Sequence, residues 1–151
     1  MKRVFSILLA GLLLASCTNE TAKEPAVKEA EGHHHHDEDH GLSLNDGKKW
    51  NSDESTNTNV QALQSVMDQF SSVQSPEIED YKFLAANLQS AIDKLVKECR
   101  MEGKDHDMLH AWLEPLMKQV RELEASADTS TASAKAREIS AQLGLYPQYF
   151  E

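Results

Sequence analysis

The sequence predicts an all-α fold, an antiparallel up-down four-helix bundle formed by residues 54–151. Three observations predict it. Apolar residues recur at spacings of three and four, turn and capping residues divide this pattern into four segments, and no stretch alternates long enough for a β-strand. Short loops between amphipathic helices favour neighbours that run antiparallel. About 95 residues suffice for one small domain with a single core.

The first two helices have recognisable starts. Ser52 or Asp53 can cap the first helix, and Ser75-Pro76-Glu77 predicts the start of the second, with Pro76 at the first helical position. The second helix is expected to end near Gly103, which can adopt a left-handed conformation. The apolar positions are Val60, Leu63, Val66, Met67, Phe70 and Val73 in the first helix, and Ile78, Tyr81, Leu84, Leu88, Ile92, Leu95 and Cys99 in the second.

The last two helices follow the same pattern. Asp105 is the expected N-cap of the third, and Pro115 predicts a kink or a local break inside it. The Ser/Thr/Ala stretch 126–133 predicts a turn, followed by a shorter fourth helix that ends at Gly144 and Pro147. The apolar positions are Leu109, Leu113, Leu116, Val120 and Leu123 in the third helix, and Ala136, Ile139 and Leu143 in the fourth.

The N-terminus has the pattern of a signal peptide. Lys2 and Arg3 precede an apolar run over residues 4–15, which is too short to span a bilayer. The run closes on Leu14-Ala15-Ser16-Cys17, which resembles the lipobox of bacterial lipoproteins. That resemblance implies removal of residues 1–16, acylation of Cys17, palmitate included, and stable anchoring in the cell envelope. Secretion with an incidental Cys17 is the alternative. Thr18 after the cysteine favours the outer membrane over the inner, by the sorting rule of enteric bacteria.

Residues 17–53 are predicted to form a flexible tether, because their acidic, apolar-poor composition cannot bury enough surface to order them. Leu42-Ser43-Leu44 and Trp50 are the positions expected to dock on the bundle. The tether contains a histidine tract of the kind that binds Zn(II), Cu(II) or Ni(II) without geometric selectivity. Its members are His33, His34, His35, His36 and His40. A remnant of an affinity tag is the alternative, but the tract lies inside an acidic linker.

The net charge and the cysteine content reduce the number of function classes that fit the sequence. The chain has a formal charge of −10, and loss of Lys2 and Arg3 with the signal peptide makes it more negative still. Such a protein repels phosphate backbones, so binding to nucleic acid is disfavoured. Of the two cysteines, Cys17 is assigned to lipid. Cys99 is then a lone thiol in a compartment that promotes disulfides, either buried and inert or kept for its sulfur chemistry.

Residues 99–110 hold the densest cluster of candidate metal ligands. His106 and His110 are four residues apart, a spacing that places two imidazoles on one face of a helix. Cys99 at the end of the preceding helix is expected to lie beside them, with Met101 as a weak fourth donor. A thiolate, two imidazoles and a thioether suit copper, and zinc would accept the cysteine and both histidines. The alternative is that Cys99 and Met101 fill the core and the histidines are solvated.

Enzyme signatures are absent from the sequence. There is no covalent haem motif, phosphate-binding glycine loop or nucleophile elbow, and only Asp107 to His110 approximates an element of a carboxylate di-metal bundle. We therefore predict a protein that is not an enzyme. Haem bound non-covalently between Met67 or Met101 and His106 or His110 is a further alternative.

Three segments together resemble small uncharacterised lipoproteins of Bacteroidetes: residues 42–50, Cys99-Arg100-Met101-Glu102-Gly103, and the run from His106 to Leu113. The resemblance covers roughly residues 41–125. It implies a helical bundle with a link to heavy-metal handling, and it favours treating the four candidate ligands as one unit. Trp50 and Trp112 would then be core anchors or a cover over the site.

The sequence therefore predicts an extracytoplasmic, membrane-anchored protein that buffers copper, or else zinc, or transfers it to a metal-transport or other envelope protein. Its proposed ligands are Cys99, Met101, His106 and His110. The rival from another class is an interaction module, a helical bundle that docks on an envelope partner and keeps Cys99 inert.

Overall fold

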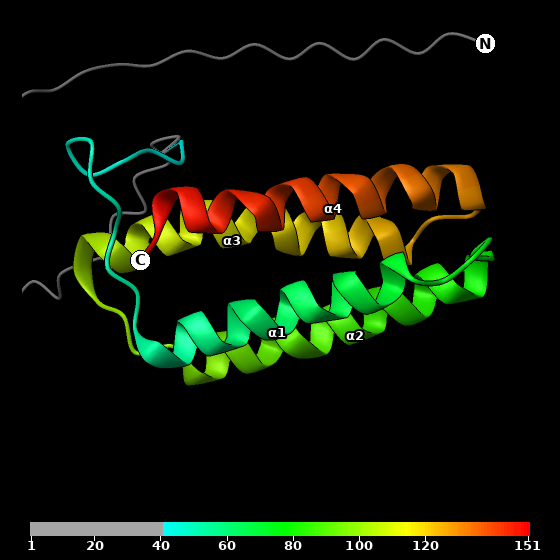
Figure 1. Cartoon of the computed structure of the whole chain (residues 1–151), viewed down its shortest axis with the longest axis horizontal. Coiled ribbons are helices and arrows are strands. Elements are labelled where there is room, and N and C mark those ends of the chain that lie inside the picture. The colour runs from blue at the N-terminus through cyan, green and yellow to red at the C-terminus, as the bar shows by residue number, and fades with distance from the viewer. Residues whose placement is uncertain (1–40) are drawn as a thin grey trace, which may run out of the picture. The chain divides into compact units, whose positions relative to one another are not determined.

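The computed structural model describes residues 41–151. The predicted signal peptide, the lipid site Cys17 and the histidine tract lie outside these residues. Within them the all-α prediction is confirmed: α1 (Glu54–Ser71), α2 (Ile78–Glu98), α3 (Gly103–Glu124) and α4 (Thr129–Tyr149) pack as adjacent antiparallel pairs, α1 with α2 and α3 with α4 (Figure 1). Extended structure in this part of the chain is limited to two isolated bridges. Among residues 41–151, no helix is both long enough and apolar enough to cross a bilayer.

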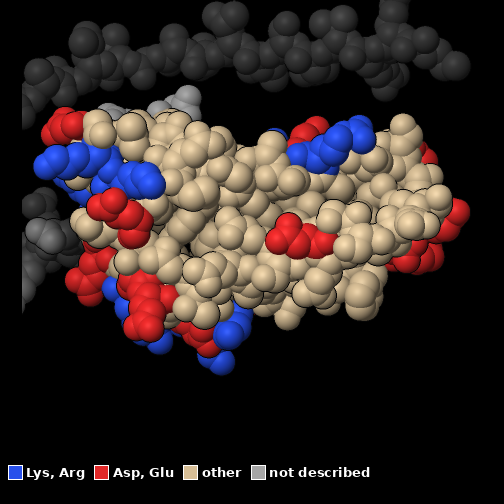
Figure 2. Space-filling model, in the orientation of Figure 1, with Lys and Arg blue, Asp and Glu red and all other residues tan. Residues whose placement is uncertain are grey.

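The core is formed largely by the apolar stripes that the spacing predicts, but the end of the first stripe is wrong: Val66 and Phe70 are only partly buried, and Val73 lies beyond α1 and is 41% exposed. The largest side chains that are fully buried are Trp112, Leu63, Leu84, Leu88, Ile92, Leu95, Leu116, Leu123 and Ile139. Each stripe turns inward because burying apolar surface stabilises the bundle by roughly 25 cal/mol per Å². On the face in Figure 2, charged side chains gather mainly at the end of the bundle where α2 meets α3.

The predicted start of α1 is confirmed, whereas two details of α2 are wrong. Asp53 caps α1 by accepting the Thr56 N–H. Pro76 lies before α2 instead of at its first position, because Glu77 is the N-cap and its N–H donates to Asp80 at 2.8 Å. Cys99 is the C-cap, so α2 ends well before Gly103.

α2 ends early because the chain just after it contacts a residue that is distant in the sequence. At Cys99 the backbone turns extended, with ψ 134°, and the next N–H, that of Arg100, donates to the Asp53 carboxylate at 2.6 Å. Gly103 does have a left-handed φ of 61°, but it opens α3. The N-cap of α3 is Glu102, so the prediction of Asp105 as the cap is wrong by one turn.

Proline and glycine interrupt the last two helices less than predicted. α3 continues through Pro115 without a break. α4 begins within the predicted turn, because Asp128 caps it by accepting the Thr131 N–H at 2.9 Å. It also passes Gly144 and Pro147 to reach Tyr149, so the prediction of a shorter fourth helix is wrong.

The segment before α1 packs on the end of the bundle, as expected for Trp50 and Leu42. Trp50 is buried, and its strand-like segment runs parallel to the C-terminus: the Trp50 N–H donates to the Tyr149 carbonyl at 2.8 Å, and the Glu151 N–H donates to the Trp50 carbonyl at 3.0 Å. Leu42 packs partly buried against the core, whereas Leu44 is exposed. These contacts hold both ends of the described chain beside the α2–α3 connection, where the candidate ligands lie.

Candidate functional site

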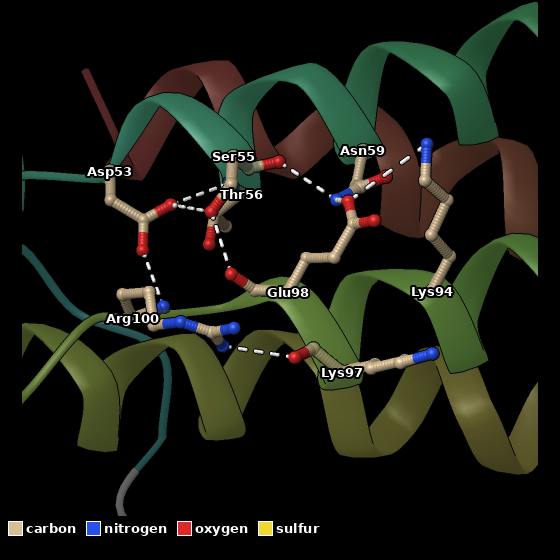
Figure 3. A network of polar contacts seen from close by, with 8 residues as sticks. All are labelled: Asp53, Ser55, Thr56, Asn59, Lys94, Lys97, Glu98 and Arg100. Carbon is tan, nitrogen blue, oxygen red and sulfur yellow. Dashed lines mark hydrogen bonds and ion pairs between the residues drawn. The ribbon is translucent and has the colours of Figure 1, made fainter.

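The α2–α3 end of the bundle brings together three parts of the chain: the start of α1, the connection between α2 and α3, and the C-terminus. Asp53 joins the first two. Its carboxylate accepts the N–H groups of Thr56 and Arg100 and the Ser55 hydroxyl (Figure 3). Partial burial raises the pKa of Asp53, but the N–H groups of Thr56 and Arg100 outweigh it and lower the pKa from 3.8 to about 2.

A second polar link joins α1 to the end of α2. Asn59 is 1% exposed, and its amide donates to the Ser55 carbonyl and to the Glu98 carboxylate, each at 2.9 Å (Figure 3). The carboxylate of Glu98 also lies 3.9 Å from the Lys94 ammonium. These polar groups satisfy one another, which indicates a structural network that fixes α1 against the end of α2.

Met101 lies inside this end of the bundle. It is buried, and its Sδ is 3.6 Å from the Ser52 hydroxyl, a hydrogen bond to sulfur. The Tyr146 hydroxyl lies 2.6 Å from the same Ser52 Oγ and 2.9 Å from Asn57 Oδ1. Burial raises the pKa of Tyr146 above its usual value, because its effect exceeds that of the hydrogen bond with Ser52, which lowers the pKa. The thioether is therefore engaged within a packed polar cluster.

Cys99 is a free, half-buried cysteine packed against the core. Its backbone N–H donates to the Leu95 carbonyl at 2.9 Å. Of the two candidate sulfur donors, Met101 is thus buried and Cys99 is half-buried against the core.

The histidines form a pair on α3. The ring centroids of His106 and His110 are 4.7 Å apart with their planes at 46°. The His110 side chain is 56% exposed, and its Nδ1 lies 3.7 Å from the Glu114 carboxylate one turn further on. His110 follows the buried Leu109 and so points about 100° away from it around the helix, toward solvent.

The structure brings the two histidines together but does not gather them with the thiol. In the described part of the chain, no three side chains of His, Cys, Asp or Glu lie close enough to hold a metal ion. The sequence places Cys99 on a helical stripe, but α2 ends one residue earlier and Cys99 packs inward as the cap. His110 is exposed and His106 is half-buried, and these two are the candidate metal ligands that the structure brings together.

The opposite end of the bundle carries a feature that the sequence reasoning missed. An open hollow of about 330 Å³ lies between the second half of α1 and the first half of α2. Its lining residues are Val66, Gln69, Phe70, Val73, Phe83, Leu84 and Asn87. Phe83 is 72% exposed. The available signal was its position, because Phe83 falls outside the apolar stripe of α2.

A scan against protein-family models, a search of the curated proteins and a search of the solved structures each find no match. A proposal for the function therefore depends on the residues of this chain.

Proposed function

We propose that this protein is a lipid-anchored, extracytoplasmic metal-binding protein that buffers or transfers copper, with zinc as the next choice. The observation that carries the proposal is the pair of His106, which is half-buried, and His110, which is exposed, with rings 4.7 Å apart on one face of α3. The pair combines nitrogen donors and helical spacing, with open access to solvent at His110.

Two imidazoles at this spacing can chelate one ion. Metal–nitrogen bonds are about 2.0–2.1 Å long, so an ion between the rings is within reach of one nitrogen from each after small rotations of the side chains. Glu114, whose carboxylate lies 3.7 Å from His110 Nδ1, can orient that ring while the other ring nitrogen binds the ion. Water would occupy the remaining positions, which suits an ion that must be released again.

The donor set favours copper. A pair of imidazoles binds divalent copper more tightly than zinc, following the general order of affinities for nitrogen sites. In this proposal Cys99 and Met101 support the fold of the bundle end, because Met101 is buried in the core and Cys99 packs half-buried against it. Two further parts of the proposal come from the sequence alone. Lipid on Cys17 anchors the tether, and the tether collects ions near the membrane through its histidine tract, His33–His36 and His40.

A metal titration tests the role of the pair. The protein with its five tether histidines replaced by asparagine is titrated with Cu(II) and with Zn(II) and followed by calorimetry. We expect one ion per chain, and a loss of at least tenfold in affinity for His106→Ala and for His110→Ala. Bound metal should also stabilise the fold, by about 2.7 kcal/mol at a concentration 100 times the Kd.

Cys99→Ser serves as the matched control, because the proposal assigns the thiol no ligand role. It should leave the Cu(II) affinity within about twofold. A protein that binds neither ion below millimolar concentration contradicts the proposal. If Cys99→Ser weakens binding as much as His106→Ala, the sequence-based centre that includes the thiol is favoured instead.

A second candidate function is that of a docking module, favoured by the exposed Phe83 and the hollow beside it. Phe83 and the hollow lie near the start of α2, whereas the proposed metal ligands lie on α3, beside the other end of α2.

A further inference from the structure

The histidine pair on α3 leaves a bound ion incompletely coordinated. His106 and His110 supply one nitrogen each from rings whose centroids are 4.7 Å apart. Within residues 41–151, no group of three His, Cys, Asp or Glu side chains lies close enough to hold an ion. Zinc in proteins takes four ligands, and copper shares its preference for imidazole nitrogen. An ion held by this pair therefore has open positions.

These open positions face solvent on the side of His110. The His110 side chain is 56% exposed, and it points about 100° away from the buried Leu109 around the helix. The half-buried His106 closes the other side of the pair. Another molecule can therefore reach the ion along the exposed surface of α3.

A second histidine pair is the ligand that suits these positions. Every copy of the chain carries the same pair, and the predicted lipid anchor would hold many copies on one membrane at a raised local concentration. In a two-fold arrangement the ion lies on the symmetry axis and meets the same two residues of each copy. Four imidazoles then fill the set of ligands that one copy leaves half filled.

The charge around the pair makes this contact depend on the ion. Asp107 and Glu114 are exposed and lie about 60° and 40° from His110 around α3, whereas Lys104 lies about 120° away. Two copies that meet at this face bring four carboxylates together, and each chain has a formal charge of −10, so they repel each other. A divalent cation on the axis offsets this repulsion, because it is the largest charge nearby.

We propose that a second copy of the chain completes the site, so that two copies share one ion through His106 and His110 of each. The inference rests on the proposed function and gives a route for metal transfer between copies. Two bonds from the ion to water break, and two bonds to neutral imidazoles of the second copy form. When water then replaces the first pair, the ion leaves with the second copy. Its charge stays at +2, and no electron or proton is transferred.

The shared state should appear when the ion is limiting. With half an ion per chain, the two pairs that face one another hold the same ion. With ions in excess, each pair takes its own ion, water fills the other positions, and the two copies separate. Saturation at one ion per chain agrees with this behaviour.

Sedimentation velocity of the full chain tests the shared site. The tether histidines are replaced by asparagine as in the calorimetric titration, and Cys99→Ser keeps the bundle thiol from reacting with Cu(II). At a chain concentration well above the calorimetric Kd, we expect mostly dimer with half an equivalent of Cu(II). Without the ion, or with a tenfold excess, the dimer should fall at least tenfold. Electron paramagnetic resonance should show Cu(II) coupled to four nitrogens at half an equivalent and to two in excess.

Two substitutions separate the metal bridge from other association. His110→Ala should abolish the dimer, because it removes a ligand from each copy. Phe83→Glu should leave the dimer unchanged, since Phe83 is exposed to 72% but lies near the start of α2, away from the pair. Circular dichroism checks that both variants retain the helical fold.

The shared site is overturned if no dimer forms at half an equivalent while calorimetry still shows Cu(II) binding that requires His110. In that case the proposed function stands and only the role of the second copy fails. A dimer that persists without the ion, in a tenfold excess of it or in His110→Ala overturns the shared site as well. A chain that binds no Cu(II) overturns both proposals.

Discussion

Replacing Asp53 by asparagine tests the connection that holds α1 against the end of α2. The asparagine carbonyl can still accept the Thr56 N–H, so the cap of α1 is kept. Its amide group, however, faces the Arg100 N–H, where a donor meets a donor. The substitution therefore removes the link between the helices and spares the local cap.

The magnitude follows from the pKa. A fall in the pKa of Asp53 from 3.8 to about 2 corresponds to at most ~2.4 kcal/mol, at ~1.4 kcal/mol for each pH unit. Because the carboxylate is partly exposed, solvent screens part of this energy, and we expect Asp53→Asn to cost about 1–2 kcal/mol at pH 7. Asp128→Asn is the matched control. Asp128 also caps a helix, but it bonds only within α4.

The effect should depend on pH in one direction. The folded pKa lies below the unfolded one, so this stabilisation is fully present above about pH 5 and is lost as the pH falls through about 2. The difference in unfolding free energy between wild type and Asp53→Asn should therefore shrink between pH 5 and pH 2. Comparing the two proteins cancels the titration of the other carboxyl groups.

Urea unfolding followed by circular dichroism at pH 7, 5, 3 and 2 provides the measurement. We expect the loss for Asp53→Asn to exceed that for Asp128→Asn at pH 7 and to approach zero at pH 2. The reasoning is refuted if the two substitutions cost the same at pH 7. A loss for Asp53→Asn that stays constant over the whole range refutes it as well.

Three further substitutions probe the same end of the bundle, each measured by urea unfolding at pH 7. Asn59→Ala should cost about 1–3 kcal/mol, because it removes a buried amide and its hydrogen bonds to the Ser55 carbonyl and to the charged Glu98 carboxylate. Trp112→Ala should cost roughly 3–5 kcal/mol, because it empties the largest fully buried side chain. Tyr146→Phe should cost only about 0.5–1.5 kcal/mol, because it keeps the ring and removes the hydroxyl bond to Ser52.

The sequence predicts the fold class well because burial dominates it. The stripes of Leu88, Ile92 and Leu116 become buried as their spacing requires, and Asp53 caps α1 as its residue type favours. Helix ends are less predictable, since they depend on contacts between distant segments. α4 passes Pro147 because Tyr146 stacks on Phe150 with ring centroids 4.7 Å apart, and the C-terminal residues pair with the segment around Trp50.

The candidate site is predictable only where its members share one helix. The spacing of His106 and His110 fixes their proximity, because the helix itself supplies the geometry. Placing Cys99 beside them required the exact end of α2 and the direction of a side chain in the connection, neither of which periodicity encodes. The hollow around Phe83 was missed for a similar reason, since a recess depends on how far two helices cover each other.

The proposed metal site and the hollow beside Phe83 occupy different ends of the bundle and should act independently. Phe83 lies near the start of α2, fifteen residues or about 22 Å before Glu98, where the helix reaches the α2–α3 end. Substitutions separated by more than 7–10 Å with no shared partners usually have additive effects. Phe83→Glu should therefore leave the Cu(II) affinity unchanged in the calorimetric titration. A change of tenfold or more would require the bundle to transmit a change along α2, against the expectation for a rigid, well-packed helix.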